Sequence, residues 1–200
     1  MLLSFQSEDG FFNSSVSGQP YLSFGISHRV HGLLLALLHA YTETQSDLIY
    51  HSIRRLISAY DLTSSTVLSS FSSNISWCSG LCGHLVTLSF LSQILPEYTF
   101  DLHKALDLLF ANDQLFMSRD LSFCCGQSGI LASHIYLRNS NVTCSDTRFE
   151  TVINKLRSNI ITAYLDNFES KQYLLYKQDM LDGFSVFPFL DDRILFYLEY

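Results

Sequence analysis

The chain has few charged residues, and this restricts what the protein can be. Only 16% of its 200 residues are charged, whereas 48% are hydrophobic and 14% are aromatic. This composition excludes a disordered chain and is typical of a domain with a substantial apolar core. The charged fraction is also low for a free-standing domain, which suggests that further sequence or a partner covers part of the apolar surface.

Basic residues are scarce as well. The chain has twelve Lys and Arg residues and a net charge of −7, and its one adjacent basic pair, Arg54-Arg55, lies in a segment with the pattern of an amphipathic helix. Without a stripe of Lys and Arg to neutralise phosphates, a nucleic-acid partner is not expected. The chain also lacks an apolar run of about 18 residues, so we expect no membrane span. Its first residues lack the basic and apolar regions of a secretory signal, which favours a cytoplasmic protein.

The five cysteines do not form the pattern of a disulfide framework. They stand at positions 78, 82, 124, 125 and 144, so their number is odd and two of them are adjacent. Free or metal-bound thiols in a reducing compartment are the better interpretation. The sequence also lacks the Gly-x-Ser-x-Gly, Gly-x-x-x-x-Gly-Lys-[Ser/Thr] and His-Glu-x-x-His motifs, which argues against the enzyme classes that carry them.

Apolar segments recur along the chain at a nearly constant spacing. Three of them open at Gly32, Gly83 and Gly129, which are 51 and 46 residues apart, and a fourth runs from residue 183 to 200. Amphipathic segments at 46–60, 97–110 and 146–168 lie between them, with apolar residues at helical spacing. A period near 50 predicts a repeated helical hairpin with a buried inner helix and an outer helix. We therefore expect an all-α fold, with short strands only near 66–72 and 172–176, and a lead-in segment over residues 1–24.

Two short segments carry the most specific chemical signal. They read Trp-Cys-Ser-Gly-Leu-Cys-Gly at 77–83 and Cys-Cys-Gly-Gln-Ser-Gly at 124–129, and each places a thiol just before a Gly-x-x-Gly step at the start of an apolar helix. Equivalent helix starts in neighbouring repeats can bring Cys78, Cys124 and Cys125 to one point. Three thiolates form a soft site suited to zinc, with the fourth position left for water or substrate.

Two other interpretations of the cysteines stay open at this stage. All of them can be small buried core residues, a frequent position for free cysteine. A local site Cys78-x-x-x-Cys82-x-His84 is also possible, because residues four apart share a helix face. Core packing is the better assignment for Cys82.

The two cysteine segments, taken together and in this order, resemble the lanthionine synthetase C-like family. Trp77, Cys78, Gly80 and Gly83 match its first cysteine motif. Its second motif is matched by Cys124, Gly126 and Gly129, with Cys125 where most members have His. Residues at the start of the first apolar segment resemble an earlier motif of the family that contains glycine and histidine. These residues are Gly25, Ser27, His28 and Gly32, with Arg29 where glycine is usual. The resemblance covers residues 25–200.

The resemblance implies an α/α toroid, here incomplete with about three and a half hairpins. It also implies a zinc ion, with Cys78, Cys124 and Cys125 as ligands, and His28 as the catalytic acid or base. A histidine at a helix entry that bonds only to backbone is the alternative for His28, and His31 replaces it if the register is shifted. The chain departs from the family at Asn74 and Ser79, where Arg and Tyr are usual, and it has no counterpart of a catalytic Asp from an earlier repeat. We therefore expect a C-terminal fragment or a shortened relative.

The function implied by the resemblance is the formation of thioether rings in a lantibiotic precursor peptide. Zinc holds a peptide cysteine as thiolate, and the thiolate adds to dehydroalanine or dehydrobutyrine. The implied partners are that peptide and the dehydratase and exporter of the same pathway, so the cytoplasmic protein would reach a membrane through a biosynthetic complex. A catalytically degenerate relative that binds zinc or peptide is the second hypothesis, and a helical-repeat interaction domain is the third.

Overall fold

The structure is a computed structural model, and it describes residues 2–13, 24–27, 30–71, 73–117, 120–143 and 145–169. Seven α-helices and three short 3-10 helices make up the regular structure of these residues. The described part contains no strand, only an isolated bridge between Gln6 and Phe12. The prediction of an all-α fold is therefore confirmed.

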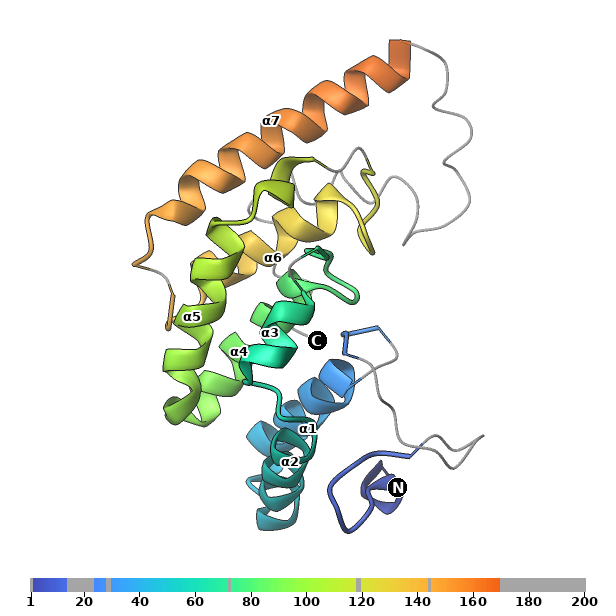
Figure 1. The fold of residues 1–200 in the computed structure, drawn as a ribbon, viewed down its shortest axis with the longest axis vertical. Helices are drawn as coiled ribbons and strands as arrows, with labels where there is room; N and C mark the ends of the chain where they lie inside the picture. Colours follow the sequence, from blue (N-terminus) through green and yellow to red (C-terminus); the bar gives the residue numbers. More distant parts are fainter. Residues whose placement is uncertain are drawn as a thin grey trace.

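Six of the helices form three hairpins, as the spacing of the apolar segments predicts (Figure 1). The first pairs α1 (Val30–Thr44) with α2 (Asp47–Tyr60), the second α4 (Leu81–Ile94) with α5 (Thr99–Phe110), and the third α6 (Gln127–Asn139) with α7 (Arg148–Glu169). The inner helix α4 contacts α1 on one side and α6 on the other. The fourth apolar segment, 183–200, lies outside the described residues.

The inner helices α4 and α6 differ in burial from the outer helix α2, as their sequences predict, whereas the inner helix α1 is buried on one side only. Helix α6 is buried on nearly all sides, and so is α4, where even the polar residues His84, Thr87 and Ser89 are inaccessible to solvent. Helix α2 is amphipathic and buries one face, with Ile53 and Leu56 fully covered while Arg54 and Arg55 are exposed. A helix that is apolar all round must be surrounded by protein, whereas an amphipathic one can form an outer layer.

Each inner helix begins two residues before the glycine that marks it in the sequence. Gly32, Gly83 and Gly129 are the third residues of α1, α4 and α6, and none of the three has a positive φ. What they share is a close contact, because a Cβ atom at each would overlap the carbonyl oxygen of the residue six positions earlier. Glycine is required here by the close approach of the preceding turn.

The strand expected near 66–72 is wrong, because this segment forms the short helix α3 (Ser65–Ser70). The Ser64 hydroxyl accepts a hydrogen bond from the Val67 amide at 3.2 Å and caps the helix. Capping by serine outweighs the β propensity of the Thr-Val pair that follows it. The other expected strand, at 172–176, lies outside the described residues.

The remaining described elements are three short 3-10 helices and the N-terminal segment. The 3-10 helices are η1 (Leu2–Phe5), η2 (Pro96–Tyr98) and η3 (Asp113–Phe116). Residues 2–13 pack on α2, where the Gln6 side-chain amide donates to the Ser52 carbonyl at 3.0 Å and Phe12 is buried. No helix within the described residues has the length and apolar character needed to span a membrane.

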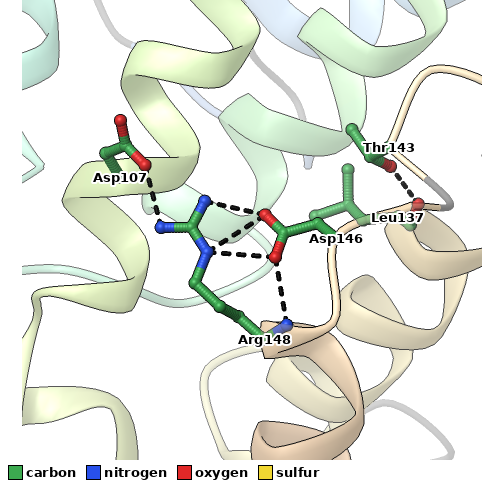
Figure 2. A network of polar contacts seen from close by, with 5 residues as sticks. All are labelled: Asp107, Leu137, Thr143, Asp146 and Arg148. Carbon is green, nitrogen blue, oxygen red and sulfur yellow. Dashed lines mark hydrogen bonds and ion pairs between the residues drawn. The ribbon is translucent and has the colours of Figure 1, made fainter.

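An arginine ties the third hairpin to the second (Figure 2). Arg148, the first residue of α7, forms ion pairs with Asp107 of α5 at 2.8 Å and with Asp146 at 2.7 Å. Its guanidinium also lies 4.4 Å from the centre of the Phe110 ring. These contacts of Arg148 connect the outer helices α5 and α7, which pack on the neighbouring inner helices α4 and α6.

Candidate metal centre

The two cysteine segments adopt the same turn before their inner helices. Residues 77–80 and 123–126 have identical patterns of turn and bend, and Gly80 and Gly126 are the N-cap residues of α4 and α6. In this register Cys78 is equivalent to Cys124, and Ser79 is equivalent to Cys125. One turn therefore contributes one thiol and the other contributes two.

The structure brings these three thiols together, as their positions before equivalent helices predict. The Sγ atoms of Cys78 and Cys125 are 3.3 Å apart, and those of Cys124 and Cys125 are 3.6 Å apart. All three sulfurs lie within 4.8 Å of one another, and no other group of three His, Cys, Asp or Glu ligands is found among the described residues. Cys78 is buried, Cys124 is half-buried and Cys125 is exposed, so the cluster opens to solvent on the Cys125 side.

Backbone hydrogen bonds join three successive helix entries side by side. The Cys78 amide donates to the Cys124 carbonyl at 3.1 Å, and this bond joins the two cysteine turns. The Cys78 carbonyl in turn accepts from the amides of Ile26 and Ser27, at 2.9 and 3.3 Å. Cys78 is thus held from both sides, by the turn before α6 and by the segment before α1.

A pair of polar residues ahead of each turn is a feature that the sequence interpretation missed. The Asn74 side-chain oxygen accepts from the amide and hydroxyl of Ser76, at 3.1 and 2.8 Å. The Asp120 carboxylate accepts from the amide and hydroxyl of Ser122 in the same way, at 2.8 and 3.0 Å. The signal was present as [Asn/Asp]-x-Ser four residues before each first cysteine, at the same spacing of 46 that separates Gly83 from Gly129.

Asn74 also bonds to Ser79, the residue that follows Cys78. Its amide nitrogen donates to the backbone carbonyl and the hydroxyl of Ser79, at 3.4 and 3.3 Å. The hydroxyls of Ser76 and Ser79 lie 3.7 and 3.6 Å from the Cys78 sulfur. This network places two hydroxyl groups against one thiol of the cluster.

The three thiols differ in acidity because their surroundings differ. Burial raises the pKa of Cys78, but contacts with Ser79, with the other two thiols and with Ser76 bring that pKa below its ordinary value. Burial and the neighbouring Cys78 raise the pKa of Cys124 to about 12, and burial also raises the pKa of Cys125. As the pH rises, Cys78 should therefore lose its proton more easily than Cys124 or Cys125.

The donor set fits zinc. A Zn–S bond of about 2.3 Å and tetrahedral angles place ligand sulfurs about 3.8 Å apart, close to the spacing of this cluster. Three cysteines leave one position of a tetrahedral ion open, as in catalytic zinc sites. A pocket of about 240 Å³ lies beside Cys125, and Asn74, Ser76, Gln114 and Met117 contribute to its wall.

The remaining candidate site residues from the sequence are His28, His31, Cys82 and His84. His28 lies outside the described residues. His31 is 1% exposed and both its ring nitrogens are engaged, so it does not replace His28 as an acid or base open to substrate. The alternative site of Cys78, Cys82 and His84 is wrong, because Cys82 is buried in the apolar core and His84 bonds to His31. Core packing is confirmed for Cys82.

Comparison with known proteins identifies the family of the chain. No curated protein matches the chain. The family model described as "Lanthionine synthetase C-like protein" matches residues 3–186 of the 200. The match spans the cysteine turns and all three hairpins, and the chain therefore belongs to the lanthionine synthetase C-like family.

Proposed function

We propose that this protein is a zinc-dependent lanthionine cyclase-like enzyme that forms thioether rings in a lantibiotic precursor peptide. The observation that carries the proposal is the convergence of Cys78, Cys124 and Cys125 beside an open pocket. Family membership agrees with a peptide as substrate. Further partners in this proposal are the dehydratase and exporter of the pathway, which would bring a cytoplasmic enzyme to the membrane.

The three cysteines would hold the zinc ion, and the pocket would receive the peptide. Bound zinc would keep the substrate cysteine deprotonated at neutral pH, since a coordinating thiol loses its proton. A shell of three thiolates carries more negative charge than one of two thiolates and a histidine. It should therefore leave the substrate sulfur more nucleophilic and less tightly held.

The bond-forming step needs one proton from the protein. The substrate sulfur attacks the β-carbon of dehydroalanine or dehydrobutyrine, the double-bond electrons move to give an enolate, and an acid protonates the α-carbon. We assign that acid to His28, whose ordinary pKa range suits proton transfer near neutrality. In the sequence His28 stands four residues before Gly32, as Cys125 stands four residues before Gly129.

The alternative is a relative that binds zinc or peptide without catalysis. It is favoured by Asn74 and Ser79, where the family has Arg and Tyr and where this chain has an internal hydrogen-bond network. The cyclase and a zinc-binding relative require the same metal centre, so metal binding and ring formation must be measured separately.

The first experiment measures zinc in the purified protein. We expect about one zinc per chain, lost in Cys78→Ser and Cys125→Ser and kept in Cys82→Ala, since Cys82 lies in the core outside the cluster. A wild-type protein that binds no zinc would exclude the cyclase and the zinc-binding relative, and would leave a relative that binds peptide alone or an interaction domain.

The second experiment tests ring formation with a dehydrated precursor peptide. The peptide is incubated with wild type, Cys124→Ala and Cys82→Ala, and its free thiols are counted by alkylation and mass spectrometry. Loss of thiols with wild type and Cys82→Ala, but not with Cys124→Ala, supports the cyclase. Zinc binding without any loss of thiols identifies the non-catalytic relative.

A further inference from the structure

Two buried histidines in the first two inner helices bond to each other. His31 of α1 and His84 of α4 are 1% and 0% exposed, and the distance from His31 Nε2 to His84 Nδ1 is 2.9 Å. The rings of Phe24 and Phe71 lie against them, with Phe71 5.0 Å from His84 between ring centres. Neither histidine belongs to the sulfur cluster.

The direction of this hydrogen bond follows from a second one. The Gly25 amide donates to His31 Nδ1 at 2.9 Å, so this nitrogen is an acceptor and carries no proton. The proton of the neutral ring is then on Nε2 and is donated to His84 Nδ1. Burial lowers the pKa of His84 to about 3, and burial together with His84 lowers the pKa of His31, so both rings stay neutral near pH 7.

The hydrogen bond from Gly25 to His31 connects the histidine pair to the backbone segment that holds Cys78. Gly25 has a φ of 145°, a conformation that glycine adopts most easily, and its amide has the His31 ring as its acceptor. The next two residues, Ile26 and Ser27, donate their amides to the Cys78 carbonyl. His31 thus fixes the turn from which two of the three backbone bonds to Cys78 originate.

A buried pair of neutral histidines is not explained by stability alone. Replacing both partners of a buried hydrogen bond with apolar groups of similar shape can be nearly neutral, so the bond itself adds little free energy. What the pair supplies is a defined position for the α1 entry relative to the α4 entry. No apolar contact would specify the orientation of the Gly25 amide in this way.

We propose that His31 and His84 are positioning residues for the metal centre, acting through residues 25–27 to hold Cys78 in its ligating position. This inference rests on the proposed function, because it gives the histidine pair a role toward the same metal. Outer-shell groups of this kind orient metal ligands in proteins and affect metal affinity.

His134 provides a matched control within the same fold. It is a fully buried histidine of the next inner helix, α6, and burial lowers its pKa to about 4. Its Nδ1 lies 2.7 Å from the Ile130 carbonyl of its own helix. Its environment resembles that of the pair, but within the described part of the chain no hydrogen bond connects it to residues 25–27 or to Cys78.

The test compares cobalt affinity with global stability in four proteins. Wild type, His31→Leu, His31→Asn and His134→Leu are titrated with Co²⁺ while the thiolate-to-cobalt charge-transfer band is followed, and each is unfolded in urea. We expect His31→Leu to weaken cobalt binding by about tenfold or more, in the range usual for outer-shell changes. In His31→Asn the side-chain oxygen can accept from the Gly25 amide, so affinity should recover toward wild type. His134→Leu should keep its affinity at comparable loss of stability.

A wild-type affinity in His31→Leu would overturn the proposal, and so would equal weakening in His31→Leu and His134→Leu. A second measurement needs no metal and no stable leucine variant. In metal-free wild type, nitrogen-15 NMR should show His31 protonated at Nε2, and the amides of Ile26 and Ser27 should be protected from hydrogen exchange. In His31→Asn that protection should persist.

The two proposals fail in different ways. If wild type takes up no cobalt, the proposed function fails, while protected Ile26 and Ser27 amides still support the histidine linkage to Cys78. If wild type binds cobalt but His31 carries its proton on Nδ1, the metal centre stands and the positioning role is overturned.

Discussion

At the scale of single residues, small polar side chains form the environment of Cys78. Two serine hydroxyls lie against the sulfur, and Asn74 bonds to both serines. These small polar side chains form a network that stabilises the thiolate of Cys78 by hydrogen bonding.

This network predicts the reactivity of the metal-free protein. Ser76→Ala together with Ser79→Ala removes two hydroxyls whose contacts lower the Cys78 pKa, so that pKa should rise and the thiolate fraction at pH 7 should fall. Iodoacetamide alkylation of Cys78, followed by mass spectrometry over a range of pH, should show slower reaction at pH 7 and a curve shifted to higher pH. Ser69→Ala, at an exposed position in α3, should react like wild type. An unchanged curve in the double variant would contradict the role given to the hydroxyls.

At the scale of elements, the repeated unit is a turn followed by an inner helix with glycine at its third position. The turn folds back so closely that the carbonyl six residues earlier occupies the space of a Cβ atom. In the third repeat the site is tighter still, since a Cβ on Gly129 would also lie 2.9 Å from the Trp77 Cβ. Trp77 belongs to the first cysteine turn, so this turn packs against the start of α6. The aromatic residues of the two cysteine turns are also in contact, with 4.9 Å between the ring centres of Trp77 and Phe123.

We therefore expect Gly129→Ala to destabilise the protein more than Gly83→Ala. Overpacking of this kind costs about 1–3 kcal/mol, and Gly129→Ala must displace a second residue as well as the turn. Urea unfolding followed by the fluorescence of Trp77, the only tryptophan in the chain, measures both effects. Ser158→Ala, at an exposed position of α7, is the control and should change stability little. Equal stability of Gly129→Ala and wild type would show that the turns are not packed as closely as described.

At the scale of the whole molecule, three buried neutral histidines link stability to pH. His31, His84 and His134 are all inaccessible to solvent, and burial lowers the pKa of each below the ordinary 6.5. An unfolded chain takes up protons at these sites as the pH falls below 6.5, whereas the folded chain resists until much lower pH. Their contribution to stability is therefore present above pH 6.5 and is lost as the pH falls towards 4 and 3.

The free energy of unfolding should fall steeply between pH 6.5 and pH 4. Each histidine contributes a slope of up to about 1.4 kcal/mol per pH unit in this interval. Urea midpoints measured at several pH values should show the decline, and His134→Leu should have a shallower slope than wild type. His51→Leu serves as the control, because His51 is exposed on α2, and its slope should match that of wild type. A stability that stays level down to pH 4 would contradict the burial of neutral histidines.

The periodic pattern of apolar residues was enough to predict the helices and their order. The segments 46–60, 97–110 and 146–168 correspond to α2, α5 and α7, and the glycines locate the inner helices to within two residues. Periodicity carries this information because an inner helix and an outer helix need different distributions of apolar side chains. The segment at 66–72 shows where the pattern was insufficient, since a serine cap made a helix of residues that favour strands.

The convergence of Cys78, Cys124 and Cys125 could also be anticipated, because equivalent positions in adjacent repeats lie side by side. Periodicity held no information about the partners of His31 and His84, which are 53 positions apart. Nor did it indicate that the Cys78 carbonyl accepts two amides from the segment before α1. Such bonds depend on the depth and rotation at which neighbouring helices pack, and only the packed arrangement of all three hairpins sets these quantities.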